Sequence, residues 1–385
     1  MSTAAEQRAF AIDPVMVGAV IGIATIGTVM VASASIPLAD RAHGEPFFFL
    51  VRHVAALGLG LAAFIVAVSV PSDYWHRASW LLMALALVLL TLVLIPGFGR
   101  DVNGSTRWLL LGPASVQASE PARLLLLLYL ASYAVRRSAA LASSFKAFAQ
   151  PMAVIALASV LLLLEPDFGA TAVLFATSLG VLFVGGARIR DFLLALVAGG
   201  VAFRVLVSLS PERMERITVF LDPFKYYREG GYQLAQSLMA IGSGEWFGVG
   251  LGESLHKLFY LPEAHTDFIF AVLAEELGFF GATLLVVLFA ALLYRAFALG
   301  QQAIREGMPF QGLVAIGIGL MLGLGVLINI GVNTGVLPTK GLALPLVSYG
   351  RSNTVATLFA IGLLARIHHE LNGGQKRLVQ GGRVR

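Results

Sequence analysis

The stretch from Lys257 to Phe279 reads KLFYLPEAHTDFIFAVLAEELGF and passes within a few residues from a polar turn into an apolar helix. We predict an interfacial turn over Pro262 to Thr266, with Asp267 in the first turn of a membrane helix. An α-helix rises about 1.5 Å per residue, so Glu275 and Glu276 would lie about 12 to 14 Å deeper. Carboxylates inside a membrane are costly, so each needs a partner, a wet cavity or a proton.

The sequence allows two interpretations of Asp267. It either complements the partial positive charge of a helix N-terminus or acts as a functional acid or base beside Glu263 and His265. A lone aspartate at such a position favours the structural interpretation. Glu275 and Glu276 point to divergent faces of the helix, which favours helix packing or partner-linked structure over chemistry.

The composition defines the class of protein. Of 385 residues, 58% are hydrophobic and 13% charged, whereas about a quarter of the residues in soluble proteins are charged. We therefore predict an all-α polytopic membrane protein. Cysteine is absent, which excludes disulfides and thiolate chemistry. The net charge of +5 is spread over many loops, so nucleic acid is not an expected partner.

Apolar segments long enough to cross a bilayer recur along the chain. About ten can be counted, at residues 14–36, 46–70, 78–96, 121–136, 148–164, 168–186, 191–209, 267–298, 312–334 and 350–368. An even number places both termini on one side, which the basic loops and tail mark as cytoplasmic. The predicted domains are a cytoplasmic segment (1–13), one transmembrane domain (14–369) with a large outer loop (210–266) carrying short interfacial helices, and a basic cytoplasmic tail (370–385). The first helix is expected to remain in the mature protein, because no short apolar leader with a cleavage site precedes it.

Four outer segments carry unusual polar residues. The first, 99–123, contains a predicted turn at Asn103-Gly104 and a helix start at Ser119-Glu120-Pro121 with Ser119 as the cap. Its Arg107 and Trp108 form either a functional pair or an interfacial aromatic with a snorkelling cation. The second segment, Glu165-Pro166-Asp167, favours a tight turn with a helix-capping aspartate.

The other two outer segments are longer. In the loop 210–266 we predict a helix start at Ser210-Pro211-Glu212 and an amphipathic stretch from Tyr232 to Ile241. A glycine-rich run follows that lacks nucleotide-loop spacing and is either flexible or close-packed backbone. The segment Asn333 to Asn353 is rich in proline and glycine, so it should be buried or line a cavity. Lys340 within it is either functional or snorkelling.

These groups converge on the outer face and suit an anionic, lipid-linked substrate. A pyrophosphate needs cationic partners, and a sugar hydroxyl that acts as nucleophile needs a base within hydrogen-bond reach. Metal-ligand spacing, a nucleophile elbow and a P-loop are absent from the sequence, which argues against hydrolysis by a serine or zinc centre.

The chain resembles the SEDS family, the shape, elongation, division and sporulation proteins of bacteria, over nearly its whole length. The resemblance is carried by LPEAHTDFIFAVLAEELG (261–278), NIGVNTGVLPTKGLALPLVSYG (329–350), NGSTRWL (103–109) and QASEPAR (117–123). The run Pro338-Thr339-Lys340-Gly341 resembles the cell-division branch more than the elongation branch. The resemblance implies a ten-helix enzyme that polymerises lipid II on the outer face of the bacterial inner membrane, at the division septum, with a class B penicillin-binding protein and other divisome proteins as partners.

The resemblance also implies roles for individual residues. Asp267 matches the family's essential aspartate and would take the proton from the GlcNAc 4-hydroxyl of lipid II, in an inverting transfer that releases undecaprenyl pyrophosphate. Candidates for binding the pyrophosphate are Arg107, Arg123, Lys257 and Lys340. Further site candidates are Trp108, Glu120, Glu263, His265, Thr266 and Ser348. A divalent cation, Mg²⁺ or Mn²⁺, could share the charge stabilisation, although the sequence identifies no metal ligands.

The sequence departs from the family pattern in two places. Arg123 stands where a lysine is usual, and Arg351-Ser352-Asn353 follow Gly350 where small residues are usual. We expect Arg351 to snorkel rather than to contact phosphate. Two other functions stay open: a transporter that flips lipid II, because intramembrane carboxylates and broken helices also mark transport sites, and a divisome scaffold without catalysis.

Overall fold

The computed structural model describes residues 13–102, 105–111, 114–209, 211–339 and 341–374. Each expected apolar segment coincides with a helix, which confirms the all-α prediction. These helices are α1 (Pro14–His43), α2 (Phe48–Ser69), α4 (Ser79–Leu94), α5 (Ser119–Arg136), α7 (Phe145–Leu164), α8 (Phe168–Val184), α9 (Ile189–Ser208), α12 (Ile269–Arg305), α13 (Pro309–Asn333) and α14 (Arg351–His369). Shorter helices connect them: α3 (Ser72–Arg77), α6 (Ser138–Leu141), α10 (Pro211–Leu221), η1 (Tyr227–Gly231), α11 (Tyr232–Ser243) and η2 (Glu370–Gly374).

Length and apolarity alone qualify six of the described helices as membrane spans: α1, α2, α7, α9, α12 and α13. Two others, α4 and α8, are apolar but shorter, and α5 and α14 carry buried polar groups. The count of ten spans therefore stays a prediction. So do the domain boundaries, because most of the proposed terminal segments 1–13 and 370–385 lie outside the described residues.

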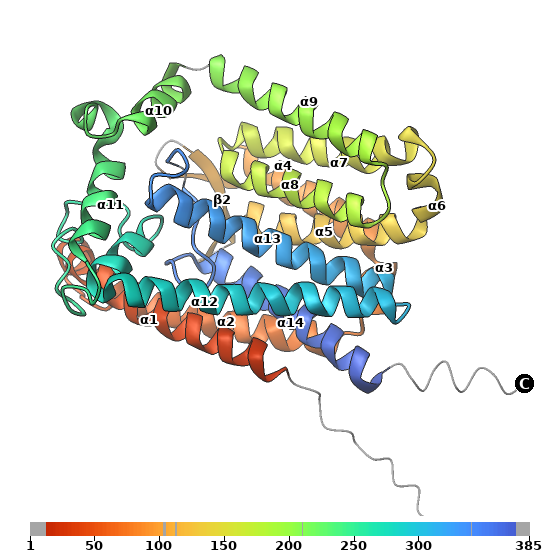
Figure 1. Ribbon diagram of the computed structural model, residues 1–385, viewed down its shortest axis with the longest axis horizontal. Coiled ribbons are helices and arrows are strands. Elements are labelled where there is room, and N and C mark those ends of the chain that lie inside the picture. The colour runs from red at the N-terminus through yellow and green to blue at the C-terminus, as the bar shows by residue number, and fades with distance from the viewer. Residues whose placement is uncertain (1–12, 103–104, 112–113, 210, 340, 375–385) are drawn as a thin grey trace, which may run out of the picture.

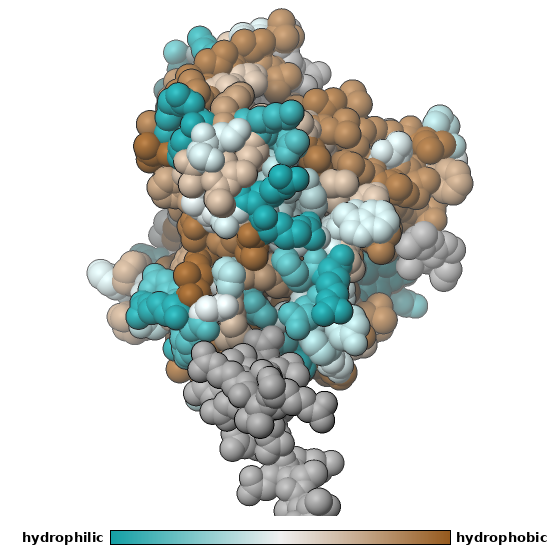
Figure 2. Space-filling view, turned by 90° about the vertical axis from the view of Figure 1, so that its right-hand side faces the viewer, coloured by the Kyte–Doolittle hydropathy of each residue, from teal (hydrophilic) through white to brown (hydrophobic). Residues whose placement is uncertain are grey.

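The long helices run side by side along one axis (Figure 1), and the four outer segments gather at one end of the bundle, beside α11 and the sheet. The first residues of α1 and the last residues of α14 lie toward the opposite end (Figure 1). Looking onto that opposite end, Figure 2 shows hydrophilic residues gathered on the surface and hydrophobic residues bordering them. The assignment of these two ends of the bundle to the outer and cytoplasmic faces stays a prediction.

Helix packing brings the first and last parts of the chain together. Helix α2 packs along α14, and α12 packs against both α1 and α13. The α2–α14 contact depends on small residues: a Cβ at Gly60 would lie 2.4 Å from the Leu358 side chain, and one at Gly362 would lie 2.7 Å from the Phe64 carbonyl oxygen. Glycines permit this close approach of membrane helices.

A small antiparallel sheet lies at the outer end of the bundle and was not predicted. It consists of β1 (Gly99–Val102), β2 (Ser105–Leu111) and β3 (Ala114–Gln117), in the order β1-β2-β3. The predicted turn at Asn103-Gly104 lies outside the described residues, between paired strands. The sheet is hard to predict because a short apolar run in β2 does not distinguish a strand from a buried helix segment.

The loop 210–266 follows the prediction in two respects. The amphipathic stretch forms α11, and α10 begins at Pro211, next to the predicted start; Ser210 itself lies outside the described residues. Part of the glycine-rich run is close-packed: Gly248 has φ +81°, and a Cβ there would lie 2.1 Å from the Glu276 carbonyl oxygen, whereas a Cβ at Gly242 or Gly252 would meet no atom within 4 Å. The run therefore packs against α12 at Gly248 and has open space at its two ends.

Two local predictions were wrong. Asp267 does not lie in a helical turn, because α12 begins at Ile269 after the N-cap residue Phe268. Ser119 does not cap α5: Ala118 is the N-cap and makes no side-chain capping hydrogen bond. By contrast, Asp167 caps α8 as predicted, accepting a hydrogen bond from the Ala170 amide at 3.1 Å.

Candidate active site

Two asparagines on α13 fix the backbone at Asp267. The Asp267 carbonyl oxygen accepts hydrogen bonds from Asn329 Nδ2 (3.0 Å) and Asn333 Nδ2 (2.9 Å). Asn329 also donates to the Leu342 carbonyl (2.6 Å), and Asn333 Oδ1 accepts from the Ala271 amide (3.1 Å). Both amides are buried. They join the turn before α12 to the segment after α13. These residues were not predicted, although two amides at (i, i+4) spacing in an apolar helix are a readable signal.

The Asp267 carboxylate faces the segment that precedes α14. A Cβ at Gly341 would lie 2.7 Å from Asp267 Oδ2, so only glycine leaves this oxygen its space. No described residue donates a hydrogen bond to the carboxylate. Burial, together with the negative charge of Glu263, raises the pKa of Asp267 to about 7, with Arg107 opposing the shift. A general base is most effective when its pKa lies near the working pH, so this carboxylate is suited to proton transfer near neutrality.

The turn around Asp267 is held by short polar contacts. Thr266 Oγ1 donates to Glu263 Oε2 (2.7 Å), and Glu263 adopts a left-handed φ of +55°. Ser348 Oγ donates to the Thr266 carbonyl (2.5 Å) and accepts from the Leu344 amide (2.8 Å). Ser348 is buried and bonded to backbone on both sides. Three of the predicted site residues therefore come together here, in contacts that shape the turn.

His265 stands on the apolar side of the same turn. Its ring packs against Phe49 and Tyr349, with ring centroids 4.9 and 5.7 Å apart. Burial lowers the pKa of His265, while the charge of Glu263 acts in the opposite direction. His265 is thus mostly neutral at pH 7 and fixes the position of the turn against α2.

Arg107 reaches the site from β2. Its guanidinium donates to the Glu165 carbonyl (Nε, 3.1 Å) and to the Pro166 carbonyl (Nη2, 2.6 Å), and its charge acts on Asp267. Asp167 also acts on Asp267 electrostatically and accepts from Ser119 Oγ at 3.2 Å. The segment interpreted from the sequence as a simple turn therefore belongs to the surroundings of Asp267.

Glu165 is the least expected member of this group. Its side chain is fully buried, and no described group hydrogen-bonds to either carboxyl oxygen. Burial and the neighbouring Asp167 raise the pKa of Glu165 to about 8. A buried carboxyl without a partner avoids the cost of a charge by holding a proton. Glu165 is therefore largely protonated at neutral pH.

Three further predicted site residues, Trp108, Glu120 and Arg123, make contacts with residues other than Asp267. Trp108 is paired with Gln117 across the sheet. Arg123 and Glu120 are both buried and form an ion pair of 2.5 Å, and Glu120 also accepts from Asn353 Nδ2 (3.2 Å). The charge of Arg123 is thus compensated by Glu120.

Lys257 lies in a second cluster, on the flank of α12. Its ammonium is 2.7 Å from Glu276 Oε1 and donates to Ser33 Oγ (2.9 Å) and to the Gly252 carbonyl (2.6 Å). These contacts occupy all three N–H donors, so the structure does not bring Lys257 to Asp267 as a free cation. Lys340 lies outside the described residues.

The fit of a divalent metal can be judged from the donor set. Among the residues that the structure describes, no group of three or more His, Asp or Glu side chains is arranged to hold a metal ion. The possible Mg²⁺ or Mn²⁺ therefore has no protein-built site in this part of the chain, and no step below depends on one.

The fold and this acidic turn define a multi-pass membrane protein with a polar centre at the end of its helix bundle. The chain belongs to the FtsW/RodA/SpoVE family of cell cycle proteins, whose model matches residues 14–373. It is 50% identical over 367 residues to a probable peptidoglycan glycosyltransferase FtsW of Thioalkalivibrio sulfidiphilus, covering 94% of this chain and 92% of the relative. A relative of the same description from Nitrosococcus halophilus is 49% identical over 358 residues, covering 93% and 92%.

Solved structures agree with this assignment. The rod-shape-determining protein RodA of Thermus thermophilus superposes with a TM-score of 0.69 at 32% identity, covering 94% of this chain and 98% of that one. A chain described in work on a peptidoglycan synthase complex that coordinates polymerization and crosslinking gives a TM-score of 0.75 at 33% identity, covering 94% and 98%. The family resemblance seen in the sequence is confirmed.

Proposed function

We propose that this protein is a peptidoglycan glycosyltransferase of the cell-division branch, located in the bacterial inner membrane at the septum with its site on the periplasmic face. It polymerises lipid II and works with a class B penicillin-binding protein and other divisome proteins. The names of relatives at about 50% identity support this activity, and the neighbour described in a synthase complex supports a transpeptidase partner.

The observation that carries the mechanism is the Asp267 carboxylate, which has no described hydrogen-bond donor and a pKa raised to about 7. In the proposed step, this carboxylate accepts the proton of the GlcNAc 4-hydroxyl as that oxygen attacks the anomeric carbon of the growing chain. The bond from that carbon to the pyrophosphate oxygen breaks with inversion, and undecaprenyl pyrophosphate leaves with the electron pair.

The surrounding residues have distinct roles in this proposal. The charge of Arg107 favours the ionised form of Asp267, and in this proposal the same cation stabilises the developing negative charge. Glu263, Thr266 and Ser348 hold the turn. Arg123 and Lys257 act through their buried ion pairs with glutamates, so we assign them positioning rather than direct contact with pyrophosphate.

The test uses the purified full-length protein and labelled lipid II, with and without the transpeptidase partner. Wild type should form glycan polymer, whereas Asp267→Asn should form at least a hundredfold less, in the range expected for loss of a general base. Asp40→Asn, an exposed aspartate near the end of α1, is the matched control and should behave as wild type. Equal polymer from Asp267→Asn would remove Asp267 as the base. Lipid II transport without any polymer from wild type would instead support the flippase alternative.

A further inference from the structure

The turn Glu165-Pro166-Asp167, between α7 and α8, lies beside β2 (Figure 1) and holds the Arg107 guanidinium through its backbone. Arg107 Nε donates to the Glu165 carbonyl at 3.1 Å, and Nη2 donates to the Pro166 carbonyl at 2.6 Å. Glu165 is the C-cap residue of α7, and the carbonyl groups at the end of a helix attract a cation. The turn therefore fixes the position of the Arg107 charge with neutral carbonyl oxygens.

The two acidic side chains of this turn have opposite surroundings. The Asp167 carboxylate accepts hydrogen bonds from the Ala170 amide (3.1 Å), Ser119 Oγ (3.2 Å) and Gln117 Nε2 (3.4 Å). Glu165 is fully buried, and no group in the described part of the chain hydrogen-bonds to either of its carboxyl oxygens. Hydrogen-bond donors favour the charged form of a carboxyl group, whereas burial without donors favours the neutral form. The surroundings thus suit an ionised Asp167 beside a neutral Glu165.

Few charged groups surround Glu165. The charge of Asp167 raises its pKa and the charge of Arg107 lowers it, with burial as the larger cause of the rise to about 8. Of the helices that pack against α7, the helices α4, α6 and α8 carry no charged side chain. The titratable side chains of α7 and α5 pair with each other or lie toward the opposite end of these helices: the pair Glu120–Arg123, then Lys146, Tyr129, Tyr133 and Arg136.

A neutral Glu165 leaves the charge of Arg107 available to the Asp267 turn, on which that charge acts. If Glu165 lost its proton, a negative charge would arise on the residue whose carbonyl oxygen binds the guanidinium. Opposite charges at such short range compensate each other, most strongly where water is excluded. The protonation state of Glu165 therefore controls how much positive potential Arg107 supplies to the site.

We propose that Glu165 is a positioning residue for the transfer reaction, because its neutral carboxyl group keeps the Arg107 guanidinium uncompensated, and that ionisation of Glu165 lowers the rate. This inference rests on the proposed function, in which Arg107 stabilises the developing negative charge. Asp267 must be ionised to act as the base, with a pKa of about 7, while Glu165 must be protonated, with a pKa of about 8. The rate should therefore pass through a maximum between these values and fall on the alkaline side.

The test measures the pH profile of kcat/KM for polymerisation of labelled lipid II by the purified full-length protein with its transpeptidase partner. Wild type should lose about tenfold in rate one pH unit above the pKa of Glu165, because only about a tenth of Glu165 stays protonated there. Glu165→Gln has a similar shape and cannot ionise, so its rate should not fall on the alkaline side, while the acid limb set by Asp267 remains. Glu306→Gln, an exposed glutamate at the end of α12, is the matched control and should keep the wild-type profile.

Two further measurements separate this role from a merely structural one. In an Arg107→Ala background, Glu165→Gln should bring no gain on the alkaline side, because the charge that Glu165 controls is absent. Infrared spectroscopy at pH 7 should show a protonated carboxyl group in wild type that is missing in Glu165→Gln. A structural role would change the rate by the same factor at every pH.

Three results would overturn the proposal: an alkaline limb in Glu165→Gln equal to that of wild type, the same alkaline gain with and without Arg107, or an ionised Glu165 at pH 7 in the infrared spectrum. If Glu165→Gln does not fold, as judged by its thermal unfolding, Glu165→Leu replaces it, since a leucine cannot ionise either. Undiminished polymer formation by Asp267→Asn, or none by wild type, counts against the proposed function. The infrared measurement needs no turnover and decides the protonation of Glu165 in either case.

Discussion

Two acidic regions at the start of α12 differ in how their carboxylates are satisfied. Glu276 accepts hydrogen bonds from Ser33, the Gly252 amide and Lys257, while Glu275 accepts from Ser254, the Leu255 amide and His256. Asp267, in the turn just before the helix, receives none from any described residue. Carboxylates that accept several hydrogen bonds from the protein stabilise the fold. A carboxylate that accepts none, at the polar end of the helix bundle, is available to a substrate.

The comparison predicts the largest effect at Asp267. Asp267→Ala should reduce glycan polymerisation at least a hundredfold, because the general base is removed. Its thermal unfolding midpoint should stay at or above that of wild type, because a buried carboxylate without a donor adds little stability. Polymer assays and thermal unfolding in the same detergent measure the two quantities. A large loss of stability in this variant would show that Asp267 is structural.

At the buried ion pair of Lys257 and Glu276 we expect the opposite pattern, a large loss of stability. Lys257→Met should destabilise the protein by about 3 to 5 kcal/mol, because the Glu276 carboxylate loses its buried partner. Lys257→Met combined with Glu276→Gln should recover much of that loss. Thermal unfolding of the two variants beside wild type is the measurement. Equal stability of Lys257→Met and wild type would contradict a structural role for the Lys257–Glu276 ion pair.

A smaller effect is expected where α13 holds the turn. Asn333→Ala removes the donor to the Asp267 carbonyl and the acceptor for the Ala271 amide, so we expect a loss of about 1 to 3 kcal/mol. Activity should fall through kcat rather than KM, because the base is displaced without loss of a substrate contact. Asn372→Ala, at an exposed position in η2, is the control. An unchanged kcat would show that the turn keeps its geometry without Asn333.

The smallest predicted effect concerns pH. As the proposed base, Asp267 would act in its ionised form, so the rate should rise with pH through the region near pH 7, where its pKa lies. The charge of Glu263 raises that pKa and the charge of Arg107 lowers it. Glu263→Gln should therefore move the acid limb of kcat/KM to lower pH, and Arg107→Ala should move it to higher pH. Shifts in the same direction for both variants would refute this electrostatic account.

Much of the fold could be predicted from the sequence because membrane helices follow from local apolarity and length. Every expected apolar segment coincides with a helix, and α12 begins within two residues of its predicted start. The sheet at 99–117 escaped prediction, since strand pairing joins residues that a single apolar run does not reveal.

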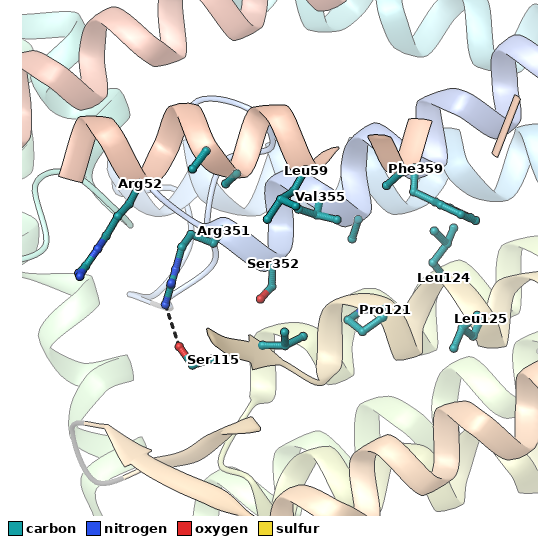
Figure 3. A pocket seen from close by; sticks show the side chains of 15 residues that line it. Arg52, Leu59, Ser115, Pro121, Leu124, Leu125, Arg351, Ser352, Val355 and Phe359 are labelled. Atoms are coloured by element: carbon teal, nitrogen blue, oxygen red, sulfur yellow. Dashed lines mark hydrogen bonds between the residues drawn. The ribbon is translucent and has the colours of Figure 1, made fainter. Parts of the chain in front are cut away.

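The candidate site likewise contains residues that the sequence predicts and residues that only the packing of the helices reveals. Asp267 could be predicted because its motif is local and because it resembles a known family. Asn329, Asn333 and the Glu165–Asp167 segment could not be ranked, since their contacts with the Asp267 turn depend on how α13, β2 and α8 pack. Arg351 was expected to snorkel. The folded structure instead places it in the lining of a groove between α2, α5 and α14, where it donates a hydrogen bond to Ser115 of β3 (Figure 3).

The sequence by itself determined the class of protein and the positions of its long helices, and it singled out Asp267 as the candidate base, because apolar length and a local motif need no distant partner. The tertiary structure decided which charged groups are free and which are compensated. The sequence predicted Lys257 and Arg123 as cations for the pyrophosphate and Arg351 as a snorkelling residue, but Lys257 and Arg123 have buried glutamates beside them. The availability of a charge depends on residues brought close by folding, and that information is not local.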